Sequence, residues 1–323
     1  MRWTSNNKML PNQNSRYGAI TRMLPPTLGK VFFVIHADNA SSQQLLEEFP
    51  VDRDGVPRVY STTSGAATDN LAIQGALDAC VSGRGDYVII MPGNGNDYDL
   101  GALLTMSKND VHLISLEGMD KDPNRVGASR QVVLEQTAAS VDVVYITGQN
   151  CEFAGFYIKN KANYSAVQTG AVAHSAYIHH NLMYMIVSTT MSVPVIDLYT
   201  TKGAIYCTVS NNFLTSQSGT CSAGIRAADS NTGTMISHNI VMVGDAATVT
   251  TGIFNGSYKG VTEYNTVAGL DGAGADGTVT TCFNTAGGVC NHNVANDADT
   301  ADFTNDGTYM DAGNYLGGIN HQT

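Results

Sequence analysis

A five-residue motif with Asn at its fourth position recurs five times at a nearly constant interval, and this repeat limits the folds open to the chain. The first copy reads Ile-His-His-Asn-Leu and the third reads Ile-Ser-His-Asn-Ile. The motif asparagines are 31, 27, 26 and 28 positions apart, and they are Asn181, Asn212, Asn239, Asn265 and Asn293. A unit of this length cannot bury its own apolar face, so each copy must stack on its neighbours.

The period predicts an all-β solenoid: a right-handed parallel β-helix with coils of 26–31 residues across residues 100–295. Asparagines at equivalent bends would hydrogen-bond along the axis as a ladder of stacked amides. A sixth copy is predicted at residues 152–156, with Gly155 in the place of Asn. Because Gly and Asn both tolerate a left-handed backbone, we interpret this position as a tight bend.

The composition agrees with a fold of many turns and few long helices, because the chain has 33 glycines and only 14% charged residues. Leucine-rich repeats have a similar period, but they need regularly placed Leu residues that are absent here. A β-propeller blade is longer than the observed period. The parallel β-helix is therefore preferred over both.

Residues 31–99 are predicted to form an N-terminal capping region with strand and helix. An apolar run at Val31–Ile35 predicts a strand, and Gln43–Phe49 predicts a short helix that a preceding Ser would cap. An extended segment resumes at Val59 and Tyr60.

A second, amphipathic helix is expected after Thr68 and Asp69, either of which would be a good N-cap. Its apolar positions continue to Cys80, and Gly83 would end it. The run at 86–93 then predicts a buried strand closed by a Pro-Gly turn. A helix followed by such a strand would cap the first coil, whose core and strand edges would otherwise be exposed.

The two ends of the chain differ in charge. Residues 1–30 contain five basic side chains and no acidic one, although the whole chain has a net charge of −11. We expect an extended basic arm whose apolar and cationic side chains dock on a partner surface. The predicted docking residues are Arg2, Trp3, Lys8, Arg16, Tyr17 and Arg22. Residues 296–323 are rich in Asp, Asn, Gly and Thr, and we interpret them as an acidic C-terminal cap or tail.

The best carboxylate pair for catalysis is Asp245 and Asp271, each six residues after a motif asparagine. Equivalent positions on adjacent coils would lie about 4.8 Å apart at the backbone. A glycoside hydrolase needs two such carboxylates. Both are followed by small residues, however, and Asp is favoured in turns because it hydrogen-bonds to its own backbone. The turn interpretation is preferred, and we predict no catalytic residue.

Lyase and metal chemistry lack the residues they would need. A β-elimination lyase needs a basic residue beside several carboxylates; Arg226 has only Asp229 nearby, which an ordinary surface ion pair explains. Three histidines occupy the position before a motif asparagine, but Asn and Tyr alternate with them, so ligands would not converge on a metal. Six cysteines without C-x-x-C spacing are expected to be buried free thiols. We therefore expect no metal and no cofactor.

Three segments resemble the N-terminal region of pectate-lyase-like β-helix proteins. They are Val59–Thr62, the Asp69–Cys80 segment containing Ala-Ile-Gln-Gly-Ala-Leu-Asp-Ala, and Gly85–Gly93 ending in Pro-Gly. The preceding Lys30–Val34 and the Gly-Arg-Gly-Asp sequence at 83–86 resemble β-helical structural proteins of tailed bacteriophages. The resemblance covers residues 30–118 specifically and 119–295 through coil architecture alone. Enzymes of the superfamily carry clustered Asp or Arg on one face, which this sequence does not offer.

The resemblance and the basic arm together lead us to expect a non-enzymatic virion protein of a bacteriophage, either a capsid-decorating protein or an appendage. It would be made in the host cytoplasm without a signal peptide, would contact other virion proteins through the arm, and would form a homotrimer. A tailspike-like protein that degrades or binds host polysaccharide is the alternative. We expect no membrane span, because no apolar run is long enough. Nucleic acid is not expected as a partner, because the arm's five charges are a modest electrostatic footprint.

Overall fold

The computed structural model describes most of the chain from Gly29 onward. The described residues are 29–37, 43–49, 51–52, 54–62, 66–93, 97–115, 132–138, 141–160, 163–186, 193–198, 205–229, 231–269, 277–285, 288–296, 301–304 and 315–316.

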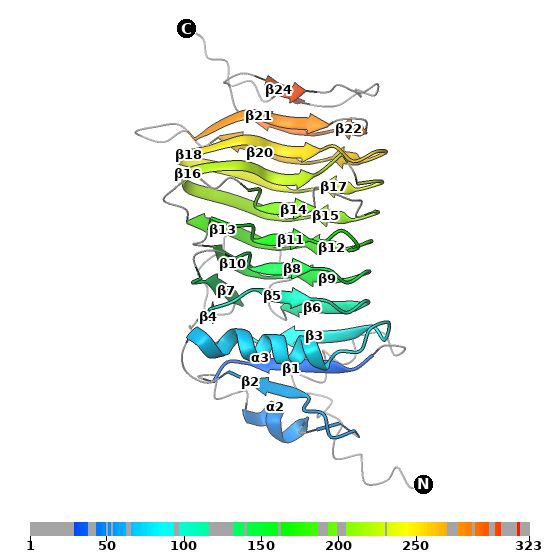
Figure 1. The fold of residues 1–323 in the computed structure, drawn as a ribbon. Coiled ribbons are helices and arrows are strands. Elements are labelled where there is room, and N and C mark those ends of the chain that lie inside the picture. The colour runs from blue at the N-terminus through cyan, green and yellow to red at the C-terminus, as the bar shows by residue number, and fades with distance from the viewer. Residues whose placement is uncertain are drawn as a thin grey trace.

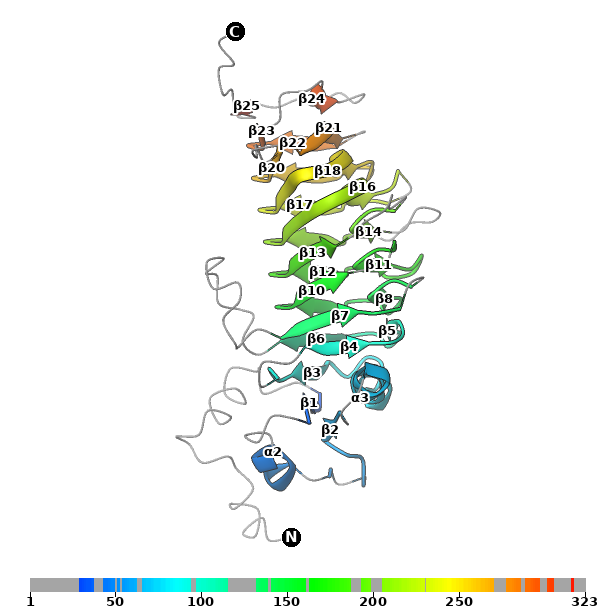
Figure 2. The same cartoon turned by 90° about the vertical axis from the view of Figure 1, so that its left-hand side faces the viewer.

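Parallel strands stack along one axis into an all-β solenoid of about 7 turns (Figures 1 and 2), as the repeat predicted. Each coil contributes strands to three sides. The first side is a ten-stranded sheet, in the order β2 (Val59–Ser61), β1 (Val31–Ile35), β3 (Asp86–Ile90), β6 (Val111–Ser115), β9 (Glu152–Ala154), β12 (Tyr177–His179), β15 (Thr208–Ser210), β17 (Met235–Ser237), β19 (Val261–Glu263) and β22 (Val289–Asn291).

The second and third sides are joined by two long strands that bend from one side to the other, β16 (Phe213–Ala227) and β18 (Ile240–Asn255). The second side also contains β4 (Tyr98–Leu100), β7 (Val133–Gln136), β10 (Tyr157–Asn160), β13 (Leu182–Ile186), β20 (Thr266–Gly269), β23 (Val294–Asn296) and β25 (Tyr315–Leu316). The third side also contains β5 (Leu104–Met106), β8 (Val144–Ile146), β11 (Val167–Thr169), β14 (Ile196–Leu198), β21 (Thr278–Thr285) and β24 (Ala301–Thr304).

The core lies inside the three sides. The alternation of residues along the short strands determines which side chains reach it. In the three-residue strands of the first side, the middle residue points inward and its two neighbours point outward. Ile178, Val209 and Ile236 are such middle residues, are aligned with one another, and are fully buried. They form one core column, as the repeat predicted.

The asparagine ladder predicted from the repeat runs along the corner after the first side. The side-chain amide of Asn181 donates to Oδ1 of Asn212 at 3.0 Å, and the same 3.0 Å contact recurs from Asn212 to Asn239, Asn239 to Asn265 and Asn265 to Asn293. Each Oδ1 also accepts the backbone N–H of the preceding asparagine. All five side chains are buried, so every amide bonds within the wall of the solenoid.

The left-handed residue of this corner is the one before the asparagine, which corrects the predicted bend position. The φ angles are positive at His180 (55°), Asn211 (54°), His238 (57°) and Tyr264 (55°). The sixth copy is therefore offset by one residue: Gly155, with φ 86°, aligns with His180. Phe156 takes the ladder position, and its N–H donates to Oδ1 of Asn181 at 3.1 Å.

The left-handed position and the ladder position differ because their side chains project into different environments. A side chain on the left-handed residue projects to solvent, where His, Asn and Tyr are accommodated and Gly can replace them. The ladder side chain projects inward and must either bond to its neighbours or be apolar, as Phe156 is.

Two helices accompany the first coils. Helix α2 (Gln43–Glu48), present where the sequence predicted one, packs Leu45 against the outer face of the first side near Phe33 and Ile89. Helix α3 (Ala66–Ala79) extends the third side beyond β5, and Gln74 exchanges two hydrogen bonds with the backbone of Thr105.

The predicted N-cap of α3 is wrong, because the helix begins at Ala66, before both Thr68 and Asp69. Asp69 lies in the first turn, is buried, and accepts the backbone N–H of Asp99 at 2.9 Å. It therefore joins the helix to β4, and the tertiary contact replaces the capping role. Helix α3 also ends at Ala79, four residues before Gly83.

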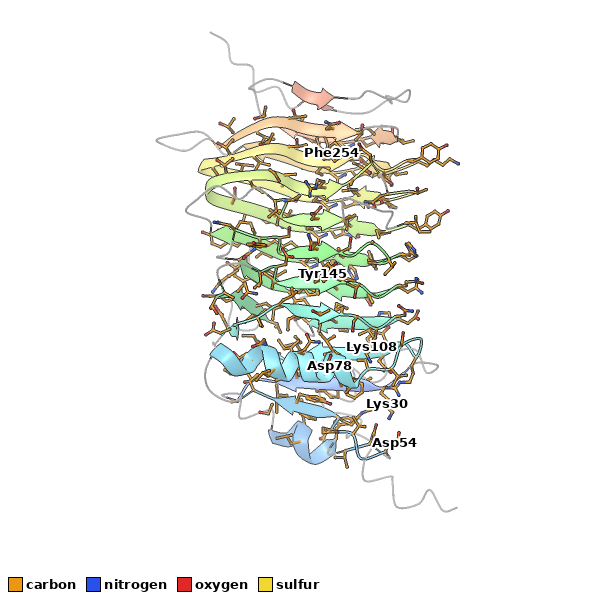
Figure 3. All side chains as sticks on the ribbon, viewed as in Figure 1. Lys30, Asp54, Asp78, Lys108, Tyr145 and Phe254 are labelled. Carbon is orange, nitrogen blue, oxygen red and sulfur yellow. The ribbon has the colours of Figure 1, made fainter. Side chains whose placement is uncertain are left out.

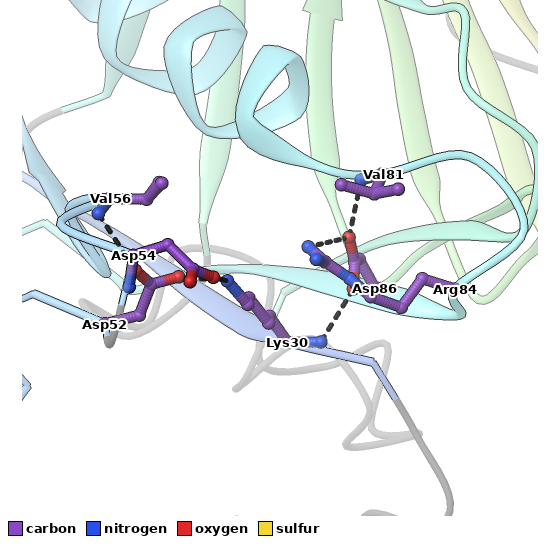
Figure 4. A network of polar contacts seen from close by, with 7 residues as sticks. All are labelled: Lys30, Asp52, Asp54, Val56, Val81, Arg84 and Asp86. Atoms are coloured by element: carbon purple, nitrogen blue, oxygen red, sulfur yellow. Dashed lines mark hydrogen bonds and ion pairs between the residues drawn. The ribbon is translucent and has the colours of Figure 1, made fainter.

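A polar network fixes the start of the solenoid (Figure 4). Asp86, at the start of β3, is fully buried and accepts the backbone N–H groups of Lys30 and Val81 at 2.6 and 2.7 Å. The Arg84 guanidinium also donates two hydrogen bonds of 2.6 Å to the Asp86 carboxylate. The side chain of Lys30 binds Asp52, and it lies 3.0 Å from Asp54. These contacts join the start of β1 to the loop between α3 and β3.

At the other end, the residues predicted as a cap or tail add strands to the solenoid. Strand β24 pairs with β21 on the third side, and β25 pairs with β23 on the second. Figure 2 labels both strands at the C-terminal end of the solenoid.

Replacing Asn239 with Ala should lower the free energy of unfolding by about 3 kcal/mol, because it leaves buried donors of Asn212 without their acceptor. Chemical denaturation of both proteins measures the difference. The matched control is His238→Asn, which keeps a residue tolerant of the left-handed backbone at an exposed position of the same corner. An Asn239→Ala protein as stable as this control would contradict the role given to the ladder.

Candidate functional site

The densest group of titratable side chains on the outer face of the first side joins three successive coils. His112 of β6, Glu152 of β9 and His179 of β12 all occupy outward positions of their strands. His112 Nδ1 lies 2.8 Å from Glu152 Oε2, and His179 Nε2 lies 2.7 Å from Glu152 Oε1. The register of the strands thus places one carboxylate between two imidazoles.

Aromatic rings enclose this histidine–glutamate network. Tyr87 stacks on His112 with ring centroids 4.3 Å apart, and Tyr177 stacks on His179 at 3.8 Å. His180, in the left-handed position of the same coil, places its Nδ1 2.7 Å from Nδ1 of His179. Tyr87 lies one strand before His112 along the axis, and Tyr177 lies in the same strand as His179, opposite Glu152.

The electrostatics of Glu152 favour the ionised form. Burial raises the pKa of this carboxyl, but hydrogen bonds from His112 and His179 outweigh it and hold the pKa at about 2. An ionised carboxylate only accepts, so both facing imidazole nitrogens must donate to it. The contact between His179 and His180 then requires a single proton between two ring nitrogens.

This geometry sets what the network can do. Both oxygens of Glu152 are engaged, so the carboxylate is not free to act as a nucleophile or general base. Within the described part of the chain, no group of three or more His, Cys, Asp or Glu side chains is arranged to hold a metal ion. The network therefore acts first as a polar clamp between coils, with tyrosine edges at the surface.

A second ionic contact lies on the third side. The Arg226 guanidinium donates to both oxygens of Asp197 at 3.0 and 2.8 Å, because the register pairs these residues directly on β14 and β16. The sequence suggested Asp229 as the neighbour of Arg226, whereas the ion pair in the structure is with Asp197. In Figure 3, Tyr145 and Phe254 are labelled on this side, and the strand register aligns them in the same outward column as the pair.

The structure does not test the pairing of the candidate carboxylates Asp245 and Asp271, because it describes only the first of them. Asp245 lies in β18, where the register with β16 is irregular between Val243 and Ala246, and it is therefore in a strand rather than a turn. Asp271 lies outside the described residues. So do the predicted docking residues of the arm, Arg2, Trp3, Lys8, Arg16, Tyr17 and Arg22.

The residues before the ladder asparagines form a stacked polar column along the corner. Tyr264 stacks on His238 at 5.1 Å and on His292 at 4.9 Å between ring centroids. The six cysteines are buried and free, and burial raises the pKa of Cys80 and Cys221 to about 12.

Sequence reasoning missed the histidine–glutamate network. Glu152 was visible only as the first residue of the sixth copy, and His112 lies 40 residues before it, outside the period of 26–31. The signal that could have found the network is strand register. Once the sixth copy is aligned by its left-handed Gly155, Glu152 falls opposite Tyr177.

No family model, curated protein or solved structure matches the chain. Neither described helix has the length and apolar character needed to cross a bilayer. The function must therefore be argued from the residues themselves.

Replacing Glu152 with Gln should cost on the order of 3 kcal/mol of unfolding free energy near neutral pH, from the displacement of its pKa from 4.5 to about 2. The folded-state pKa is the lower one, so this stabilisation is complete above about pH 4.5 and disappears as the pH falls toward 2. Denaturation of both proteins between these pH values measures it.

The control for this prediction is Glu263→Gln, which removes a carboxylate from an outward position of the same side. It should change stability much less, because Glu263 is not held between two imidazoles. If the difference in unfolding free energy between the wild type and Glu152→Gln stayed constant with pH, the lowered pKa assigned to Glu152 would be contradicted.

Proposed function

We propose that this chain is a non-enzymatic structural protein of a bacteriophage particle, either a capsid-decorating protein or an appendage. Its solenoid serves as a rigid body, and residues 1–30 attach it to other virion proteins. The proposal follows from the resemblance of residues 30–118 to phage β-helix proteins and from the basic, partly apolar composition of the arm.

The observation that supports the structural role most directly is that outward carboxylates are engaged in contacts between coils. Glu152 is held by two imidazoles, and Asp197 by the Arg226 guanidinium. Asp97 lies 2.5 Å from the ammonium of Lys159. A glycosidase needs one carboxyl group as acid and another as base or nucleophile. Carboxylates already bound to hydrogen-bond donors or cations of the same chain are poorly suited to those roles.

A rigid wall also suits a protein that extends from a particle. The ladder, the network at Glu152 and the Asp197–Arg226 pair each join neighbouring coils across the wall of the solenoid. Each coil contacts only its neighbours, so the stiffness of the solenoid depends on the contacts between adjacent coils. These side-chain contacts therefore oppose bending.

Polysaccharide binding is the second candidate, and exposed tyrosines favour it. Tyr206 and Tyr258 are 64% and 61% exposed, near one corner of the first side. The Lys259 ammonium lies 5.3 Å from the centre of the Tyr258 ring. Aromatic rings with a polar hydroxyl can contact both the apolar face and the hydroxyl groups of a sugar.

Deleting residues 1–28 should leave a folded protein that no longer joins the particle. The deletion keeps Gly29, whose N–H donates to Gly85 O at 3.1 Å, and Lys30 with its contacts to Asp86 and Asp52. Occupancy on purified particles should fall to background, and full-length binding should weaken with salt. The control is Lys259→Ala, which removes a cation outside the arm. Normal occupancy of the truncated chain would show that the arm is not the attachment device.

Replacing Asp245 and Asp271 together with Asn should leave particle assembly unchanged. The same double variant tests the enzymatic alternative, with polysaccharide cleavage by the purified protein as the measurement. If the wild-type chain cleaves a polysaccharide and the double variant does not, the non-enzymatic proposal is wrong.

A further inference from the structure

The outer face of the second side is unusually apolar. From β13 onward, its strands present two outward columns between inward residues such as Met183, Leu214 and Val241. The outward residues are Leu182, Phe213, Ile240, Thr266 and Val294 in one column, and Tyr184, Thr215, Met242 and Ala268 in the other. We call these nine residues the apolar patch. None of them is charged.

The strand sequences indicate that this sheet is covered on both faces. A sheet with one face in water shows apolar and polar residues in alternation, whereas a sheet buried on both faces reads as a continuous apolar run. Strand β13 reads Leu-Met-Tyr-Met-Ile, and β18 begins Ile-Val-Met-Val. Ile240 is nevertheless 38% exposed.

The third side provides the contrast within the same coils. Its outward column contains the polar or charged residues Gln168, Asp197, Arg226 and Asn284 together with Tyr145 and Phe254. The strands of the second side lie at the left of Figure 1 and face the viewer in Figure 2, and neither described helix lies over them. The third side thus mixes charged and polar residues with aromatic ones along its outer face, whereas the patch on the second side has no charged residue.

The charge distribution decides between possible occupants. The chain has a net charge of −11, so two copies repel one another except where their facing surfaces lack charge. The ionic cluster of Asp97, Glu135 and Lys159 ends at β10, one strand before the patch begins. A basic arm would need carboxylates in the patch, and a polysaccharide would need hydrogen-bond partners for its many hydroxyl groups. The patch has no carboxylate, and its only side-chain hydroxyl groups are those of Tyr184, Thr215 and Thr266.

We propose that the apolar patch is the surface through which a second copy of this chain packs, with the two solenoids side by side. Each copy then covers the uncharged sheet of the other, and the acidic surfaces stay apart. In a symmetric dimer or a closed ring, every copy presents the same patch to its neighbours. The proposal does not depend on a role in a phage particle.

The test is the self-association of the purified full-length chain, measured by sedimentation equilibrium. The variant is Phe213→Lys/Ile240→Lys, two charges at outward positions of neighbouring strands. The control is Gln168→Lys/Asn284→Lys, the same charges at outward positions of the third side. Circular dichroism and thermal melting establish that each variant is folded.

We expect the wild-type chain and the control to form a dimer or a closed ring that persists at high salt. The patch variant should dissociate with a dissociation constant raised at least about 100-fold, because each lysine must be buried without a partner. A monomeric wild-type chain would overturn the proposal. So would a folded patch variant that associates as the wild type does, or an association that salt abolishes. Because no particle is needed, failure here leaves the proposed virion role untouched.

Discussion

The asparagine ladder is the interaction on which the rest of the solenoid depends. A coil wall that turns a corner buries backbone groups that the strand ladders do not reach, and an unpaired buried group is costly. Asn239 meets this need in both directions: its Oδ1 accepts from Asn212, and its amide donates to Val209 O and to Asn265. Because each amide needs the next one in register, the ladder fixes how the coils from Asn181 to Asn293 are aligned with their neighbours.

Register in turn determines which distant residues meet. His112 and Glu152 are 40 positions apart, yet they lie side by side because β6 and β9 pair in register. Asp197 and Arg226 meet in the same way, 29 positions apart. A solenoid therefore turns separation along the chain into contact along the axis. Its polar networks are clamps between coils, and they strengthen the fold where neighbouring coils contact one another.

The three sides of the solenoid share one inner architecture and differ outside. The first side carries the histidine–glutamate network and the stacked corner column, and the third carries an ion pair between polar residues. The second side turns aliphatic and aromatic residues outward from β13 onward. Since the inward positions alone are needed to build the core, the outward positions are free to specify partners. The differences among the sides are thus where function is to be sought.

The sequence by itself determined the period, the parallel β-helix, the core column and the ladder, because the repeat places the same residue type at the same point of each coil. It also located β1 and α2 from local patterns. The tertiary structure decided what local patterns do not encode. The left-handed residue is His180 and not Asn181, the residue that the repeat predicted, since only contacts between coils determine which side chain points inward. The tertiary structure turned Asp69 from a helix cap into a tie to β4. It assembled the network around Glu152 from coils whose spacing departs from the period, because strand pairing, not sequence distance, selects neighbours.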